Sequence, residues 1–199
     1  MTPPIARRPH PRAVAAVCTV ALLGELVIAC SPDDDMPAVV SVELRSSTDE
    51  PANTESPGGA VPRLTLTVHN DSDTACSVPK QGIGSAIVTT VTRDGTDVVS
   101  TSRPIPTFAP SIDAVRAALA TLPPGESLAL DVQTASDPAV VESHRIETDG
   151  TLMRTSWPVD EQGEYRITAA LATPPAAARD GLPPLCTPAD PSTTTFTVR

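Results

Sequence analysis

The clearest structural signal in the chain is the stretch Arg63-Leu64-Thr65-Leu66-Thr67-Val68-His69, in which apolar and polar side chains alternate. Successive side chains of a β-strand point to opposite faces of its sheet. We therefore expect Leu64, Leu66 and Val68 to face a core and the threonines to face water. The polar residues 70–73 follow directly and are typical of a turn. The stretch predicts a half-buried strand that ends at residue 69.

Working outward from this strand, the same reasoning predicts further short strands on both sides of it. They are expected at residues 39–44, 86–92, 97–100, 127–132, 140–146, 152–157, 165–171 and 193–199. Asp94-Gly95 joins two of them into a hairpin, because this pair supplies the positive φ angles of a tight turn. Residues 46–59 and 173–191 have the composition of loops.

Residues 111–119 are the one place where a helix is expected. Ser111 is a good N-cap for a short helix that runs to Leu119, although Val115, Ala117 and Leu119 also alternate as in a strand. About seven to nine short strands separated by turns, with at most one short helix, indicate an all-β protein of the β-sandwich type. A closed β-barrel is the alternative.

Three short motifs add a family resemblance over residues 61–172. They are Asn70-x-Ser72 after a strand, Pro124-Gly125-Glu126-Ser127 before a strand, and Gly163-x-Tyr165 at the start of a late strand. In these three motifs the chain resembles bacterial immunoglobulin-like domains and is similar to BsuPI-type proteinase-inhibitor domains. The resemblance implies an immunoglobulin-like β-sandwich domain over residues 39–199. Inhibitor function would be an analogy that rests on fold alone.

The N-terminal segment has the pattern of a secretory signal peptide. Its first twelve residues contain three arginines and no acidic residue, and residues 13–23 are almost wholly apolar. A membrane-spanning helix needs about 20 apolar residues, whereas Glu25 interrupts this run early. We therefore expect residues 1–29 to be a cleaved signal peptide, with an uncleaved membrane anchor as the alternative.

The end of this segment, Leu26-Val27-Ile28-Ala29-Cys30, resembles the lipobox of bacterial lipoproteins. The resemblance implies that Cys30 becomes the N-terminus and carries a diacylglyceryl group, which anchors the protein on the extracytoplasmic face of the membrane in the cell envelope. Glu25 departs from the pattern, since these signals are usually uncharged there. Residues 30–38 are polar and are expected to be a tether. The alternative is an ordinary signal peptide cut near Ala29, which leaves Cys30 a plain thiol.

The charge of the chain excludes some partners. The 199 residues contain 14 basic and 24 acidic side chains; without residues 1–29, which hold three Arg and one Glu, 11 basic and 23 acidic remain, a net charge of −12. Nucleic acid binding relies on Lys and Arg against phosphate, so no nucleic acid partner is expected. Anionic lipid headgroups are excluded on the same ground, so the membrane would be bound through the lipid alone.

The cysteine count predicts one disulfide. Of four cysteines, Cys18 leaves with the signal peptide and Cys30 is taken by lipid. Cys76 and Cys186 remain in an oxidising compartment, where pairing is the usual outcome. The alternative is two unpaired thiols too far apart to bridge.

No pattern of catalytic residues emerges. The expected mature chain has His69 and His144 as candidate bases, and neither lies in a nucleophile motif. A metal site would use His69 with Asp71 and Asp73, with or without His144, but acidic turn residues are usually only solvated. We therefore expect no catalytic residue, cofactor or resident metal. The expected function is a non-catalytic binding or structural module that contacts an envelope protein. The alternative is an inhibitor or accessory subunit of an extracytoplasmic protease or envelope complex.

Replacing Cys30 by serine tests the lipid anchor. Two acyl chains suffice for stable membrane attachment, so the Cys30→Ser variant should leave the membrane fraction or remain a longer precursor. Detergent partitioning and intact mass measure both effects. A variant that partitions as the wild type does and has an unchanged N-terminus would contradict the lipobox.

Overall fold

The computed structural model describes residues 38–47, 61–80, 84–106, 110–147, 150–188 and 190–199. All of them belong to one compact unit, residues 35–199. This part of the chain contains fourteen strands in four sheets and one short α-helix. The predicted all-β class is therefore confirmed. The strands outnumber the expected total of about seven to nine, because several short strands have no signal of their own in the sequence.

The strands are distributed along the whole of this unit. They are β1 (Ala38–Ser47), β2 (Arg63–Asn70), β3 (Cys76–Pro79), β4 (Ala86–Arg93), β5 (Thr96–Asp97), β6 (Thr101–Pro104), β7 (Leu119–Leu122), β8 (Ser127–Val132), β9 (Thr134–Ser136), β10 (Ala139–Ile146), β11 (Leu152–Pro158), β12 (Gly163–Leu171), β13 (Cys186–Pro188) and β14 (Ser192–Val198). The α-helix is α1 (Ile112–Ala117), and a 3₁₀ turn, η1 (Ala176–Ala178), precedes β13.

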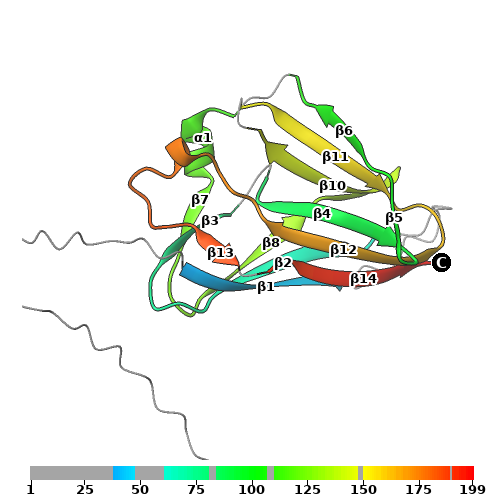
Figure 1. The fold of residues 1–199 in the computed structure, drawn as a ribbon, viewed down its shortest axis with the longest axis horizontal. Coiled ribbons are helices and arrows are strands. Elements are labelled where there is room, and N and C mark those ends of the chain that lie inside the picture. Colours follow the sequence, from blue (N-terminus) through cyan, green and yellow to red (C-terminus); the bar gives the residue numbers. More distant parts are fainter. Residues whose placement is uncertain (1–37, 48–60, 81–83, 107–109, 148–149, 189) are drawn as a thin grey trace, which may run out of the picture. The chain divides into compact units, whose positions relative to one another are not determined.

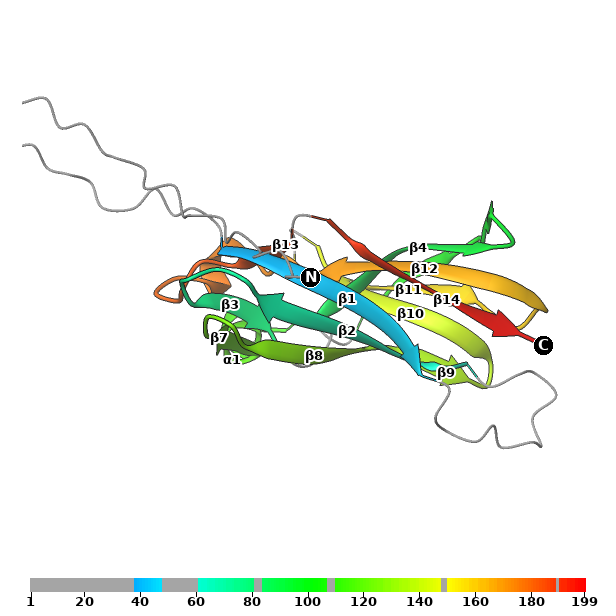
Figure 2. The ribbon, with the colours of Figure 1, turned by 90° about the horizontal axis from the view of Figure 1, so that it is seen from below.

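The two sheets that form most of the core have the orders β13-β1-β2-β8 and β14-β12-β4-β5. Figures 1 and 2 show β4 and β12 in one layer and β1, β2 and β8 in the other. A third sheet, β6-β11-β10-β9, reaches the start of β4, where the Ser143 hydroxyl accepts a 3.1 Å hydrogen bond from the Val88 N–H. The small sheet β3-β7 lies with α1 at the end remote from the C-terminus (Figure 1).

Strand β2 is the inner strand on which the first sheet is built. It pairs antiparallel with β1 on one side and with β8 on the other. Leu64, Leu66 and Val68 are completely buried, as their alternation predicts. The strand therefore has one face in the core and one face toward solvent, which is the usual arrangement of an antiparallel sheet.

The core itself is built mainly from Val, Leu and Ala, with three aromatic side chains among them. Tyr165 and Phe196 stack on neighbouring strands, with their ring centroids 5.4 Å apart. Trp157 is 6% exposed and Tyr165 is 1% exposed. Both side chains therefore belong to the core.

The predicted hairpin and helix are both present, with different bounds. Asp94 and Gly95 have φ angles of 50° and 82° and connect β4 to β5. Ser111 caps α1 by accepting a hydrogen bond from the Ala114 N–H. The helix ends earlier than expected because Leu119 already belongs to β7, where it pairs with Pro79. The alternation seen in the sequence thus marks the transition from helix to strand.

Five strands were not expected: β3, β6, β7, β9 and β13. Each has three or four residues with no clear alternation; β6 is wholly exposed, and β13 lies in the predicted loop 173–191. They exist because a neighbouring strand supplies hydrogen-bond partners. For example, β13 runs parallel to β1, with Ala38 opposite Cys186. Such pairing joins residues far apart in the chain, and no local pattern encodes it.

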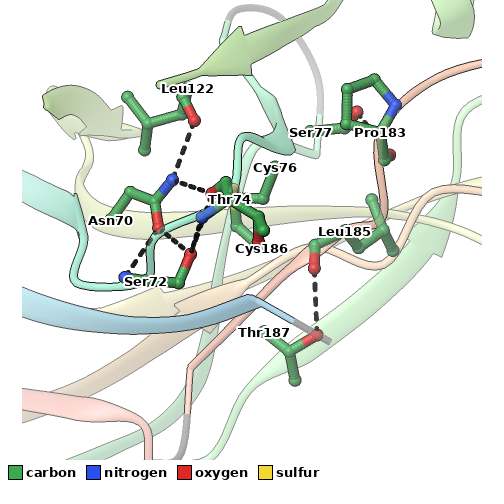
Figure 3. Close-up of a disulfide and its surroundings, with 10 residues drawn as sticks. All are labelled: Asn70, Ser72, Thr74, Cys76, Ser77, Leu122, Pro183, Leu185, Cys186 and Thr187. Atoms are coloured by element: carbon green, nitrogen blue, oxygen red, sulfur yellow. Dashed lines mark hydrogen bonds between the residues drawn. A yellow bond between two sulfur atoms is a disulfide. The ribbon is translucent and has the colours of Figure 1, made fainter. Parts of the chain in front are cut away.

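The turn after β2 is organised by Asn70, which is completely buried. Its Nδ2 donates to the carbonyl oxygens of Thr74 and Leu122, both at 2.9 Å, and its Oδ1 accepts from the N–H and hydroxyl of Ser72 (Figure 3). A buried amide needs such partners, since each unmade bond costs roughly 1–3 kcal/mol. Asn70 therefore holds the turn 71–74 against the end of β7.

The predicted disulfide between Cys76 and Cys186 is present. The two Cα atoms are 5.0 Å apart, and both residues are buried in the core beside the Asn70 turn (Figure 3). The bond joins β3 to β13 across 110 residues of sequence. The Ser77 hydroxyl reinforces the junction by donating to the Pro183 carbonyl at 2.8 Å.

The predicted signal peptide, residues 1–29, and the lipidation residue Cys30 lie outside the described residues. The tether was expected to extend to residue 38, but Ala38 is already part of β1. Within the described part of the chain, no helix has the length and apolar character needed to span a membrane.

Removing the disulfide should destabilise the domain. Replacing both Cys76 and Cys186 by alanine returns loop-closure entropy to the unfolded chain, so the free energy of unfolding should fall by about 3–5 kcal/mol. Urea unfolding followed by tryptophan fluorescence measures the change, and reduction of the wild type should produce a similar loss. Equal unfolding midpoints in the wild type and the double variant would contradict this role.

Candidate functional site

A pocket of about 250 Å³ lies between α1 and the ends of several strands. Its lining combines one face of the helix with segments that follow β3 and β12 and with the ends of β4 and β10. The residues that define it best are Ile87, Ala114, Val115, Ala118, Leu119 and Ile146. Almost all are aliphatic, so the pocket is suited to an apolar group.

Prolines shape the walls of this pocket. Pro79, Pro110, Pro174 and Pro175 all line it, at points where a strand or helix begins or ends. Proline has a fixed φ angle and no N–H group, so these walls are rigid and add no hydrogen-bond donor. These prolines lie far apart in the chain and meet only in the folded structure, which is why the sequence showed no sign of the pocket.

The pocket has one charged lining residue among those described, Arg145. Its guanidinium already donates to Glu147 Oε1 at 2.6 and 3.0 Å, so the pair is close to neutral. Thr173 adds a hydroxyl to the lining. The pocket therefore offers apolar contact area and no array of catalytic groups.

Gly84 fixes the contact between one wall of the pocket and β10. Its φ angle is +86°, and a Cβ atom built there would lie 3.2 Å from the His144 carbonyl oxygen. Glycine suits both conditions, because it tolerates positive φ and allows the backbones to approach closely. The start of β4 is thereby held against the end of β10.

His144 is buried on β10, with 8% of its surface exposed and with Nδ1 lacking a hydrogen-bond partner. Burial lowers the pKa of His144, Glu142 acts in the opposite direction, and Arg154 lowers it further. The desolvation cost of the imidazolium is the largest of these effects. His144 is therefore a neutral core histidine, and it does not line the pocket.

The candidate metal ligands are only partly brought together. His69 Nε2 lies 3.3 Å from Asp71 Oδ1, while His144 belongs to a different sheet. Nowhere in the described part of the chain do three His, Cys, Asp or Glu side chains gather as they would around a metal ion. His69 instead contacts a residue that the sequence marked only as part of a turn motif: its Nδ1 lies 2.8 Å from the Ser127 hydroxyl.

A second groove, polar in character, lies where β4 and β5 approach the start of β12. Its charged residues are Arg93, Asp97, Asp160 and Glu161. Arg93 is ion-paired with Glu161, and the Tyr165 hydroxyl donates to the Glu161 carbonyl. These contacts stabilise the turn before β12, so Arg93 and Glu161 have a structural role in the groove.

Comparison with known proteins does not identify a family: the chain matches no family model and no curated protein. The resemblance to BsuPI-type domains and to the lipoprotein signal therefore rests on the quoted motifs alone. Function has to be argued from the pocket and from the surface chemistry.

The buried histidine should make stability depend on pH. Because burial lowers the pKa of His144, the unfolded chain takes up a proton where the folded one does not. The stabilising contribution of neutral His144 to the free energy of unfolding is therefore complete above about pH 6.5. It declines as the pH falls from there toward the lowered pKa. His144→Gln should flatten this part of the profile in urea unfolding between about pH 5 and pH 8.

His69→Gln is the matched control, because the side chain of His69 is 41% exposed. The part of the pH slope that His144→Gln removes should remain in this variant. A His144→Gln profile parallel to that of the wild type would show that His144 does not carry the effect.

Proposed function

We propose that this protein is a lipid-anchored binding module on the extracytoplasmic face of the bacterial cell envelope, and that its pocket beside α1 receives an apolar group of an envelope protein. The pocket is the observation that carries the proposal. It is lined by aliphatic side chains and prolines and lies at the end of the domain where α1, β3 and β7 gather (Figure 1). A concave apolar surface with few polar groups is typical of a binding site.

Export is supported by two independent features. The first is the basic and then apolar N-terminal segment that ends at Cys30. The second is the Cys76–Cys186 disulfide, since such bonds form and persist mainly outside the cytoplasm. In this proposal Cys30 carries the diacylglyceryl group, and the acidic domain, which anionic headgroups repel, stands away from the membrane surface.

The domain is proposed to be an immunoglobulin-like β-sandwich. The order β1-β2-β8 in one sheet and β14-β12-β4 in the other matches strands A-B-E and G-F-C of that fold. Two features depart from it. Strands β9, β10 and β11 are inserted between the E and F positions, and the disulfide leaves from β3, outside both sheets.

Filling the pocket tests its role. Ala118 is half-buried and lines the pocket, so Ala118→Trp should occupy the space that a ligand would take. The uncharged probe N-phenyl-1-naphthylamine should fluoresce on binding the wild type and lose most of this signal with the variant. Ala129→Trp is the matched control, because Ala129 is exposed on β8 and tryptophan is tolerated on strands.

The partner is then tested by cross-linking in intact cells, with wild type, Ala118→Trp and Ala129→Trp compared. An envelope protein that is captured by the wild type and by Ala129→Trp, but not by Ala118→Trp, supports the proposal. A protease captured in this pattern would favour the inhibitor or accessory-subunit function instead. Equal probe binding by all three proteins would rule out the pocket as the site.

A further inference from the structure

Ser127, His69 and Asp71 form a connected group on the outer face of the sheet β13-β1-β2-β8. His69 and Ser127 are directly opposite each other on β2 and β8. The Ser127 hydroxyl lies 2.8 Å from His69 Nδ1, and Asp71 Oδ1 lies 3.3 Å from His69 Nε2. The imidazole thus contacts a hydroxyl on one side and a carboxylate on the other, which is the arrangement that activates a serine as a nucleophile.

The carboxylate decides which nitrogen of His69 is basic. The Asp71 carboxylate lies 3.3 Å from Nε2 as a charge pair, not as an aligned hydrogen bond, and when ionised it electrostatically favours the tautomer of His69 that carries its proton on Nε2. Nδ1 then has a free lone pair, and the Ser127 hydroxyl must be the donor in the 2.8 Å contact. The serine proton is therefore already directed at a base.

The position of Asp71 is itself held by buried structure. Asp71 follows Asn70, whose side chain bonds the turn at Ser72 and Thr74 and reaches across to Leu122. His69 and Ser127 lie on two paired strands. All three members of the group are thus attached to rigid parts of the fold, as a reactive constellation requires.

The strand register also supplies a donor for a developing negative charge. The Asn70 N–H donates to the Glu126 carbonyl at 3.0 Å, so this carbonyl points toward β2. In a planar trans peptide the N–H points opposite to the carbonyl, so the Ser127 N–H points away from β2. Since β8 is the last strand of its sheet, the Ser127 N–H points to the open edge.

We propose that Ser127 is a nucleophile for activated acyl esters, with His69 as its general base and Asp71 as the group that positions His69. The Ser127 oxygen adds to the ester carbonyl as its proton passes to Nδ1 of His69. The ester C–O bond then breaks, and the leaving alcohol takes that proton, which gives acyl-Ser127. Water, deprotonated by His69, then adds to this ester. The bond between the acyl carbon and the Ser127 oxygen breaks, His69 returns the proton to the serine oxygen, and the carboxylic acid leaves.

This activity goes beyond the proposed binding function and is independent of the pocket. It also departs from the expectation, drawn from the sequence, that the chain has no catalytic residue. The group is open to solvent, with the side chain of His69 41% exposed and that of Asp71 46% exposed. Its substrates are therefore small, reactive acyl donors that need no binding cleft.

Covalent labelling tests the proposal directly. The full chain, purified from whichever cell fraction contains it, is treated with a fluorophosphonate probe, and the modified residue is identified by peptide mass spectrometry. The adduct is expected on Ser127. His69→Ala should slow labelling by about 100-fold, the lower end of what a general base supplies. Asp71→Asn should slow it as well, because the amide can donate to Nε2 and so select the wrong tautomer.

Ser136→Ala is the control, because Ser136 is an exposed serine on β9 that is remote from the group in sequence. This variant should be labelled and should hydrolyse p-nitrophenyl acetate as the wild type does, whereas Ser127→Ala should lose both properties. All four variants alter exposed side chains, and circular dichroism checks that they fold. Absence of labelling, labelling spread over several serines, or wild-type rates in His69→Ala would each overturn the proposal.

Discussion

The covalent bond between Cys76 and Cys186 is the constraint on which the end of the domain with the pocket depends. It fixes β13 next to β3, and β13 in turn pairs with β1. The segment that returns from β12 to Cys186 passes Pro174, Pro175 and η1. Arg116 of α1 donates to carbonyl groups of η1, at 2.8 Å for the closer one. The helix, the proline wall and the first sheet are thereby attached to one another.

Asn70 performs a related task without a covalent bond. Its amide is buried at the end of β2. It donates hydrogen bonds to the carbonyl oxygens of Leu122, before β8, and of Thr74, before β3. Both hydrogens of the amide are used inside the fold. One side chain thus connects the central strand, the disulfide region and the turn that carries Asp71.

The two proposed functional surfaces, the pocket beside α1 and the group around Ser127, differ in polarity. The pocket beside α1 removes apolar area from water and has almost no charge of its own, which suits binding. The group around Ser127 lies on an exposed sheet face, where water competes for every polar contact, so its reactivity depends on how well His69 is oriented.

The sequence by itself determined the all-β class, the positions of the longer strands, the Asp94-Gly95 hairpin and the pairing of Cys76 with Cys186. These follow from side-chain alternation, turn propensities and the number of cysteines, which are local or countable properties. Only the tertiary structure decided the sheet order, the short strands, the pocket, the burial of His144 and the contact between His69 and Ser127. These arise from backbone pairing and packing between segments that are distant in the chain, such as the 58 residues that separate His69 from Ser127. Patterns within a single strand cannot carry that information, because the register between two strands is set only when they meet.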